Sequence, residues 1–107
     1  MKYSDIKFIK HPPRYGSTVG LYIGRYLVSQ SLVELMWSQA AASLPTLDWS
    51  RKQDVKSVFG DKEFWLSHKI GARIALGRCL KFFVDHGMLP MLEANHGKKG
   101  PRRYIRK

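Results

Sequence analysis

Residues 67–107 combine three local signals in a fixed order: a helical periodicity, a glycine stop, and two short runs around a turn-forming segment. Apolar side chains recur at steps of four and three, the spacing that places them on one helical face, at Leu76, Leu80 and Phe83. Ser67 precedes them as a residue whose hydroxyl can cap a helix, and Gly87 follows them as one able to adopt the left-handed conformation that ends many helices. These signals predict a helix over residues 67–86.

The segment after this glycine predicts two β-strands joined by a turn. Residues 88–93 are a short apolar run, and residues 103–106 form a second run that carries a tyrosine and an isoleucine. Residues 94–101 hold two glycines, an asparagine and a proline, which favour turns. The turn and the residues just after it also carry four cations: Lys98, Lys99, Arg102 and Arg103. We therefore expect a β-hairpin over residues 88–107 with a cationic tip.

A helix that ends in DHGMLPML and a hairpin that ends in HGKKGPRRYIRK resemble the recognition helix and the wing of the winged helix-turn-helix superfamily. In that superfamily the helix lies in the major groove of DNA, and the wing contacts the backbone or the adjacent minor groove. The resemblance implies core positions at Leu76, Leu80, Phe83 and Met88. It implies groove-facing positions at Arg73, Ile74, Gly77, Arg78 and Lys81. The expected fold class is a winged helix-turn-helix, mainly α with a small C-terminal β-hairpin.

The first helix of a helix-turn-helix pair is expected at residues 51–59, with the helix described above as the second. Asp48 or Ser50 would cap the first helix, and Gly60 would end it. The following segment, residues 61–66, is longer than the turn of a simple helix-turn-helix and contains two large aromatic residues. Either this segment forms an extra helical turn, or the second helix begins earlier, within it.

The N-terminal part of the chain is expected to complete a single domain spanning residues 1–107. Residues 1–16 contain an alternating stretch and several lysines, so we expect either a short strand added to the sheet of the hairpin or a basic arm. Residues 17–44 are expected to form one long helix ended by Pro45, with apolar side chains around more than half of its circumference. Such a helix either runs through the middle of the domain or uses its spare face to form a homodimer.

A strong positive charge indicates a polyanionic partner. Nineteen basic residues against eight acidic ones give a net charge of +11, and residues 51–107 alone carry +9. Lysine and arginine neutralise phosphates and release condensed counterions, which supplies most of the non-specific affinity for nucleic acid. The predicted DNA contacts are Arg51, Lys52, Lys69, Arg73, Arg78, Lys81, Lys98, Lys99, Arg102 and Arg103. Arg73 and Arg78 are the candidates for reading bases, because arginine can bind guanine through two hydrogen bonds.

Several function classes find no support in the residue pattern. Cys79 is the single cysteine, which rules out an intramolecular disulfide and a metal site built from several cysteines, and we expect a small buried side chain there. The four histidines lack zinc-motif spacing and the eight carboxylates are scattered, so we expect no metal, no cofactor and no catalytic residue. Neither a signal-peptide pattern nor a long apolar run suited to a membrane occurs, so we expect a cytoplasmic protein that is associated with the nucleoid when it binds DNA.

The sequence thus predicts a non-enzymatic protein that binds double-stranded DNA, namely a small regulator of transcription or replication that acts as a dimer. Two alternatives stay open. The same charge would serve an RNA-binding component of a ribonucleoprotein. The same fold would also serve a small inhibitor or adaptor that binds a nucleic-acid-processing protein.

Overall fold

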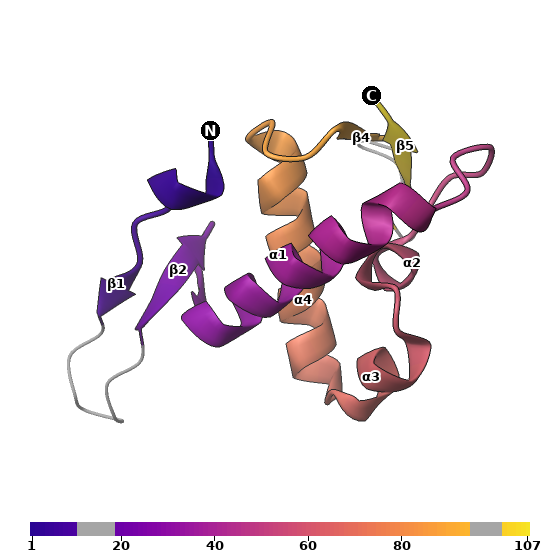
Figure 1. Cartoon of the computed structure of the whole chain (residues 1–107). Helices are drawn as coiled ribbons and strands as arrows, with labels where there is room; N and C mark the ends of the chain where they lie inside the picture. Colours follow the sequence, from indigo (N-terminus) through magenta and orange to yellow (C-terminus); the bar gives the residue numbers. More distant parts are fainter. Residues whose placement is uncertain (11–18, 95–101) are drawn as a thin grey trace.

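Two antiparallel sheets lie on either side of a group of helices (Figure 1). The computed structural model describes residues 1–10, 19–94 and 102–107. Within these residues the helices are α1 (Gln30–Ser43), α2 (Val55–Phe59), α3 (Lys62–Ser67) and α4 (Ile70–Asp85), and short 3-10 turns occur at η1 (Tyr3–Asp5) and η2 (Leu44–Thr46). The N-terminal sheet has the order β1 (Ile9–Lys10), β2 (Val19–Ile23) and β3 (Tyr26–Ser29), and the C-terminal sheet pairs β4 (Met91–Glu93) with β5 (Tyr104–Arg106). The fold is therefore mixed α and β. The predicted C-terminal hairpin is confirmed, and the N-terminal sheet adds β structure beyond the expected class.

The prediction of one long helix over residues 17–44 is wrong in its first half. Strands β2 and β3 form a hairpin there, with Ile23 opposite Tyr26. Gly24 has a φ of 61° and begins the two-residue turn, the position at which a type II′ turn needs glycine. The strands are rich in β-branched and aromatic residues, which fit a pleated surface. The helix therefore begins only at Gln30, and it ends at Ser43, close to the expected boundary.

The N-terminal residues also take a place that differs from the expected one. Ile9 pairs with Gly20 and Lys10 pairs with Val19, so β1 is the edge of the N-terminal sheet. The expected addition of a strand to the sheet of the C-terminal hairpin is therefore wrong. β1 and β2 are consecutive strands in the sequence, and consecutive strands usually pair with each other. Residues 11–18 lie outside the described part of the chain.

Helix α1 crosses α4 and buries one face against it (Figure 1). The buried side chains recur at steps of three and four, at Val33, Met36, Ala40 and Ser43. Beside this face, the Trp37 ring stands edge-on to Phe83 with centroids 5.2 Å apart, and Tyr3 of η1 stacks on the other side of Trp37 at 5.1 Å. Trp37 is thus partly covered within the monomer by Tyr3 and Phe83.

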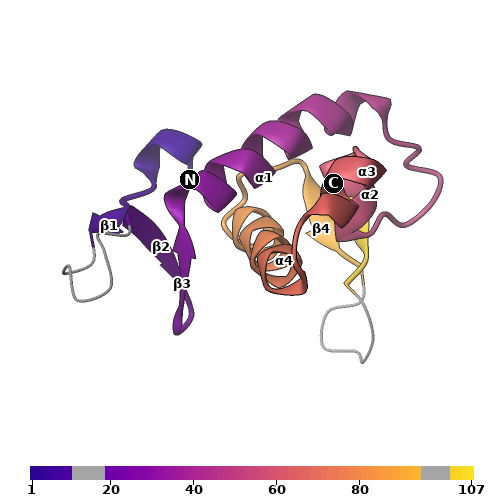
Figure 2. The same cartoon turned by 90° about the horizontal axis from the view of Figure 1, so that it is seen from below.

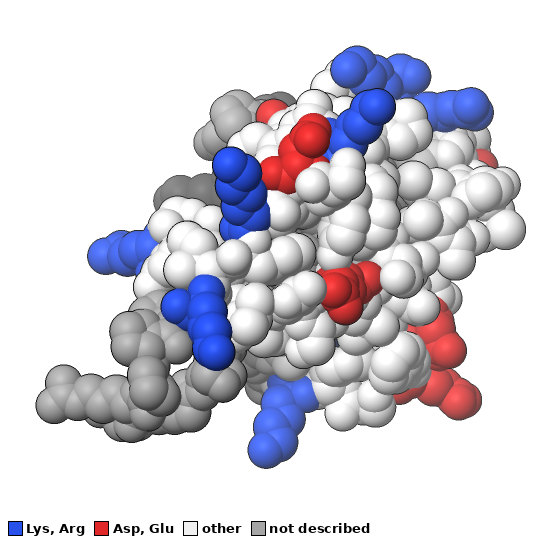
Figure 3. Space-filling model, turned by 60° about the vertical axis from the view of Figure 1, so that its left-hand side comes forward, with Lys and Arg blue, Asp and Glu red and all other residues white. Residues whose placement is uncertain are grey.

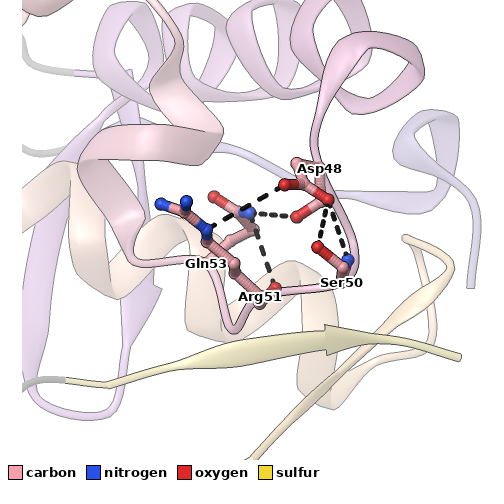
Figure 4. Close-up of polar contacts among 4 residues, drawn as sticks. All are labelled: Asp48, Ser50, Arg51 and Gln53. Atoms are coloured by element: carbon pink, nitrogen blue, oxygen red, sulfur yellow. Dashed lines mark hydrogen bonds and ion pairs between the residues drawn. The ribbon is translucent and has the colours of Figure 1, made fainter.

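Helix α2 starts later than predicted, because the chain before it is held in an extended conformation. The Gln53 N–H donates to the Tyr104 carbonyl at 2.8 Å, and the Tyr104 N–H donates back at 2.7 Å. The Gln53 side-chain amide also donates to the Asp48 and Arg51 carbonyls, and the Asp48 carboxylate accepts from Ser50 (Figure 4). These hydrogen bonds hold residues 48–53 as a loop. At its end, Gln53 pairs with Tyr104 of β5 as a residue of a third strand would.

Aspartates begin both short helices of the middle segment. Asp54 accepts the Ser57 N–H at 2.8 Å and caps α2, so Asp48 and Ser50 do not serve as the predicted cap. Gly60, with a φ of 91°, ends α2 as predicted. Asp61 then accepts the Phe64 N–H at 3.0 Å and caps α3. The extra helical turn is the expectation that the structure confirms.

The predicted cap of the last helix is wrong as well. Ser67 is the final residue of α3, and its hydroxyl donates to the Phe64 carbonyl at 2.6 Å. Helix α4 begins at Ile70, since the chain turns sharply after α3 before it enters α4. At its other end, Gly87 has a φ of 66° and ends the helix as predicted.

The core lies where α1, α2, α4 and the C-terminal hairpin meet. The predicted core positions Leu76, Leu80 and Phe83 are fully buried, as is Cys79. Met88 is only half-buried. The hairpin instead buries Met91 and Tyr104, one from each strand, and Phe59 of α2 completes the centre of the core.

Candidate nucleic-acid interface

The face of α4 that points away from the core carries the residues expected to face a groove. Arg73, Ile74, Gly77 and Arg78 line a shallow depression of about 530 Å³ together with Val55, Trp65, Ile70 and Arg102. A methyl group on Gly77 would meet no atom within 4 Å, so no neighbouring side chain covers the helix surface at that position. The structure therefore brings together four of the five predicted groove-facing positions on one accessible helix face.

The two sheets flank this helix on opposite sides. Figure 2 looks nearly along α4 and shows the β2–β3 hairpin on one side and β4 on the other. Both sheets contact α4, through β2 and through β4. The outer face of α4 therefore lies between the β2–β3 hairpin and the β4–β5 hairpin.

Three of the predicted cations at this face form no ion pair among the described residues: Lys69, Arg73 and Arg78. Lys69 is exposed at the position just before α4. Arg73 donates from Nε to the His68 carbonyl at 2.8 Å and from Nη2 to the Leu66 carbonyl at 3.5 Å. These bonds hold the guanidinium beside the turn between α3 and α4, with its charge uncompensated by a carboxylate.

Arg78 is held by an aromatic ring. Its guanidinium carbon lies 3.6 Å from the centroid of the Tyr26 ring, which comes from β3. This geometry is that of a cation–π contact, which orients a cation without neutralising it. Arg78 is therefore oriented by the N-terminal sheet, and no carboxylate among the described residues pairs with it.

Two other predicted cations, Lys81 and Arg102, are paired with carboxylates of α4 and β4. Lys81 Nζ lies 3.0 Å from Asp85 and 3.1 Å from Glu93, and Arg102 Nε lies 3.9 Å from Glu93. Partial burial disfavours the charged form of Lys81, but hydrogen bonds to the two carboxylates outweigh it and raise the pKa. The pairs tie α4 to β4, and they reduce the positive charge that Lys81 and Arg102 present to solvent.

Arg103 forms a comparable link to α2. Its Nη1 donates to Asp54 Oδ2 at 3.1 Å. Partial burial works against the charged form of Asp54, yet hydrogen bonds from Ser57 and the arginine beside it hold the pKa of this carboxyl below its ordinary value. This pair joins the start of α2 to the strand that carries Tyr104.

The remaining predicted contacts lie away from the α4 face or outside the described residues. Arg51 and Lys52 are exposed in the loop before α2, and Arg51 Nε lies 4.0 Å from Asp48 (Figure 4). Lys98 and Lys99 fall in residues 95–101, which the structure does not describe. The side of the molecule that carries the N-terminal sheet is shown in Figure 3. Among the described residues in that view, lysines and arginines stand apart, with acidic residues among them.

Sequence reasoning missed two residues next to this face, Arg25 and Tyr26. They were assigned to the interior of a helix, whereas Arg25 is exposed in the β2–β3 turn. The signal that could have found them is Gly24 followed by arginine between two runs rich in β-branched and aromatic residues, a pattern typical of a two-residue hairpin.

Other kinds of site find little in the described part of the chain. No group of three or more histidine, cysteine or acidic residues there could hold a metal ion. Burial raises the pKa of the Cys79 thiol to about 12, so the thiolate is disfavoured near neutral pH. Among the same residues, no helix has the length and apolar character needed to cross a bilayer. Comparisons with protein-family models, curated proteins and solved structures gave no match to this chain.

Proposed function

We propose that this chain is a non-enzymatic protein that binds double-stranded DNA through α4 and through Arg102 and Arg103 at the turn end of the β4–β5 hairpin, in the manner of a winged helix-turn-helix. The order of the elements supports this proposal. A first helix, α1, is followed by the extended residue Gln53, by α2 and α3, by α4, and then by the hairpin whose β5 pairs with Gln53. In this arrangement α4 takes the place of the recognition helix and β4–β5 takes the place of the wing.

The observation that carries the proposal is the charge on the outer face of α4. Lys69, Arg73 and Arg78 lie on or beside that face without carboxylate partners among the described residues. Clustered uncompensated cations repel one another, and a polyphosphate relieves that repulsion while it releases its own counterions. The face belongs to an accessible α-helix, the element that the major groove of a DNA duplex admits.

The aliphatic residues of the same face suggest how bases would be read. Ile70 is 69% exposed and Ile74 is 50% exposed, one turn apart. Apolar side chains in the major groove contact the methyl group of thymine, and an arginine can bind guanine. We propose that Ile74 contacts thymine and that Arg78 reaches a guanine, whereas Lys69 contacts a phosphate.

A role in regulating transcription or replication, and binding as a dimer, are further parts of this proposal. A dimer would select an inverted repeat of two half-sites, because its two-fold symmetry is imposed on the DNA. Site selection from random duplex DNA at two salt concentrations tests this directly. Recovery of an inverted repeat supports a dimeric regulator, and uniform recovery contradicts sequence-specific regulation.

The matched variants for DNA binding are Lys69→Gln with Arg78→Gln, compared with Arg106→Gln. Arg106 is exposed at the end of the β4–β5 hairpin opposite to Arg102 and Arg103, where it pairs with Met91 and lies beside Leu47 and Pro90. It is therefore outside both proposed DNA-contact surfaces. If about six phosphates are contacted, the logarithm of the affinity should fall with the logarithm of the salt concentration with a slope of about −5. The double variant should bind duplex DNA more weakly, and Arg106→Gln should not. Equal binding by the double variant and the wild type would reject the assignment of α4.

A second candidate function is an adaptor or inhibitor that binds a nucleic-acid-processing protein. The observation that favours it is the apolar character of the α3–α4 surface, where Phe64, Leu66, Ile70 and Ile74 are exposed. Structured RNA as a competitor and stoichiometric copurification with a protein distinguish the alternatives. RNA that displaces duplex DNA at equal concentration favours a ribonucleoprotein role, and a stable protein complex without DNA affinity favours the adaptor.

A further inference from the structure

We infer that the β2–β3 hairpin is a second DNA-contacting ribbon, placed on the side of α4 opposite the β4–β5 hairpin, with Arg25 as its phosphate contact. This inference rests on the proposed DNA binding by α4. The turn of the β2–β3 hairpin extends beyond α4 on the side that faces away from α1 (Figure 2). A duplex that lies along the outer face of α4 would therefore meet this turn as well.

Two contacts of α4 show that its outer face is built between two ribbons. Arg78 reaches Tyr26 of β3 on one side, at 3.6 Å. Lys81, one turn further along α4, reaches Glu93 of β4 on the other side, at 3.1 Å. The same helix face is thus tied to both sheets. The two ties differ in charge, because the β4 side is neutralised by a carboxylate and the β3 side is not.

The charge at the β3 side has no internal compensation among the described residues. The Arg25 guanidinium carbon lies 6.0 Å from the Tyr26 ring centroid, at the outer limit of a cation–π contact, and the Arg78 guanidinium lies much closer to the same ring. Neither arginine forms an ion pair within the described part of the chain. The two guanidinium groups near this ring leave an excess of positive charge beside β3, and a DNA phosphate bound by Arg25 would reduce it.

The hairpin is also firmly positioned, as a contacting ribbon requires. Four residue pairs hold β2 to β3, and the turn is the two-residue form begun by Gly24. A methyl group on Gly20 would come within 2.5 Å of the Val28 carbonyl oxygen, so the two strands approach as closely as glycine permits. Arg25 is therefore presented from a short turn between two paired strands, which limits the backbone conformational entropy lost when it binds.

Arg25→Gln is the first test, with Arg106→Gln as the control for loss of one positive charge. Arg25 is exposed in a turn, so the substitution should leave the circular dichroism spectrum and the melting temperature unchanged. Loss of one phosphate contact should make the log–log salt slope shallower by about 0.9. Between 50 and 200 mM salt, the wild type should therefore lose about 3.5-fold more affinity than Arg25→Gln does. Arg106→Gln should keep the wild-type slope.

A second test asks whether Tyr26 positions Arg78. Tyr26→Phe keeps an aromatic face and should bind like the wild type, whereas Tyr26→Leu removes the ring and should weaken binding. In an Arg78→Gln background, Tyr26→Leu should have no further effect on affinity, because the two residues act together. Additive losses would show that Tyr26 does not act through Arg78.

The outcomes separate the two proposals. If the wild type fails to bind duplex DNA at low salt, both the proposed function and the second ribbon are rejected. If the wild type binds, and Arg25→Gln has the same salt slope as Arg106→Gln, the second ribbon is rejected while DNA binding through α4 stands. A shallower slope for Arg25→Gln alone supports the second ribbon.

Discussion

Replacement of Asp54 by alanine should destabilise the fold, because this carboxylate both caps α2 and binds Arg103 beside β5. Loss of an N-cap costs about 1 kcal/mol. The ion pair adds about 0.5 kcal/mol, since the Asp54 and Arg103 side chains are 35% and 42% exposed and solvent screens their attraction. The free energy of unfolding should therefore fall by about 1.5 kcal/mol, which lowers the melting temperature by about 6–10 °C in a domain of this size.

Urea denaturation of three variants, followed by circular dichroism, separates these contributions. Asp54→Asn keeps an acceptor for the Ser57 N–H and loses the charge, so it should cost about 0.5 kcal/mol. Asp61→Ala is the matched control, because Asp61 caps α3 in the same way and forms no ion pair with the described residues. It should cost less than Asp54→Ala. Equal losses for Asp54→Ala and Asp61→Ala, or for Asp54→Ala and Asp54→Asn, would refute the reasoning.

The same carboxylate should make stability depend on pH in a defined direction. The pKa of Asp54 in the folded protein lies below its ordinary value of 3.8. The unfolded chain therefore binds a proton more readily, and the stabilisation is fully present above the unfolded pKa and is lost as the pH falls through the folded pKa. The difference in unfolding free energy between the wild type and Asp54→Asn should shrink below about pH 4. A difference that stays constant down to pH 2 would contradict this.

Three further predictions concern two buried side chains, Cys79 and Tyr104, and the exposed surface at Gly77. The Cys79 thiol, whose pKa is raised to about 12, should react with an alkylating reagent at pH 8 only after denaturant is added, and fast labelling of the native protein would contradict its burial. Tyr104→Phe should raise the unfolding free energy by about 1 kcal/mol, because the hydroxyl is buried with no hydrogen-bond partner among the described residues. Gly77→Ala should stabilise α4 by up to about 1 kcal/mol. It should also weaken DNA binding, because the added methyl group would project into the depression on the outer face of α4.

The parts of the fold that the sequence predicted correctly are those set by local signals. Leu76, Leu80 and Phe83 lie on the buried face of α4 because helical spacing alone determines which side chains share a face. Gly60 and Gly87 end their helices because positive φ favours glycine wherever it occurs. These conclusions needed no knowledge of the rest of the molecule.

The parts that were wrong depend on partners distant in the sequence or on two patterns that overlap. Residues 19–29 are apolar at both helical and alternating positions, and pairing with β1 and packing on α1 decide in favour of strands. Residues 51–54 have helical composition but stay extended because Gln53 pairs with Tyr104. Pattern analysis of a single segment cannot reveal either partner.

The sequence predicted that Arg73 and Arg78 share the outer face of α4, but it did not show which of the predicted cations are paired with carboxylates. Glu93 comes to lie beside Lys81 and Arg102 only when β4 folds back along α4. The sequence therefore identified the cations of the α4 face without showing which of them an acidic neighbour already compensates. Arg25 and Tyr26 were missed for the related reason that their place beside Arg78 requires the hairpin.

The pairing of Gln53 with Tyr104 has a consequence for how the protein is made. Tyr104 belongs to the last strand and is almost wholly buried, while its backbone partner lies near the middle of the chain. A ribosome releases the middle long before the end, and until then α1, α2 and α4 lack one wall of their shared interior. Formation of the native state is therefore expected to wait until residue 106 has left the exit tunnel. A variant that lacks residues 102–107 should be a target for proteolysis.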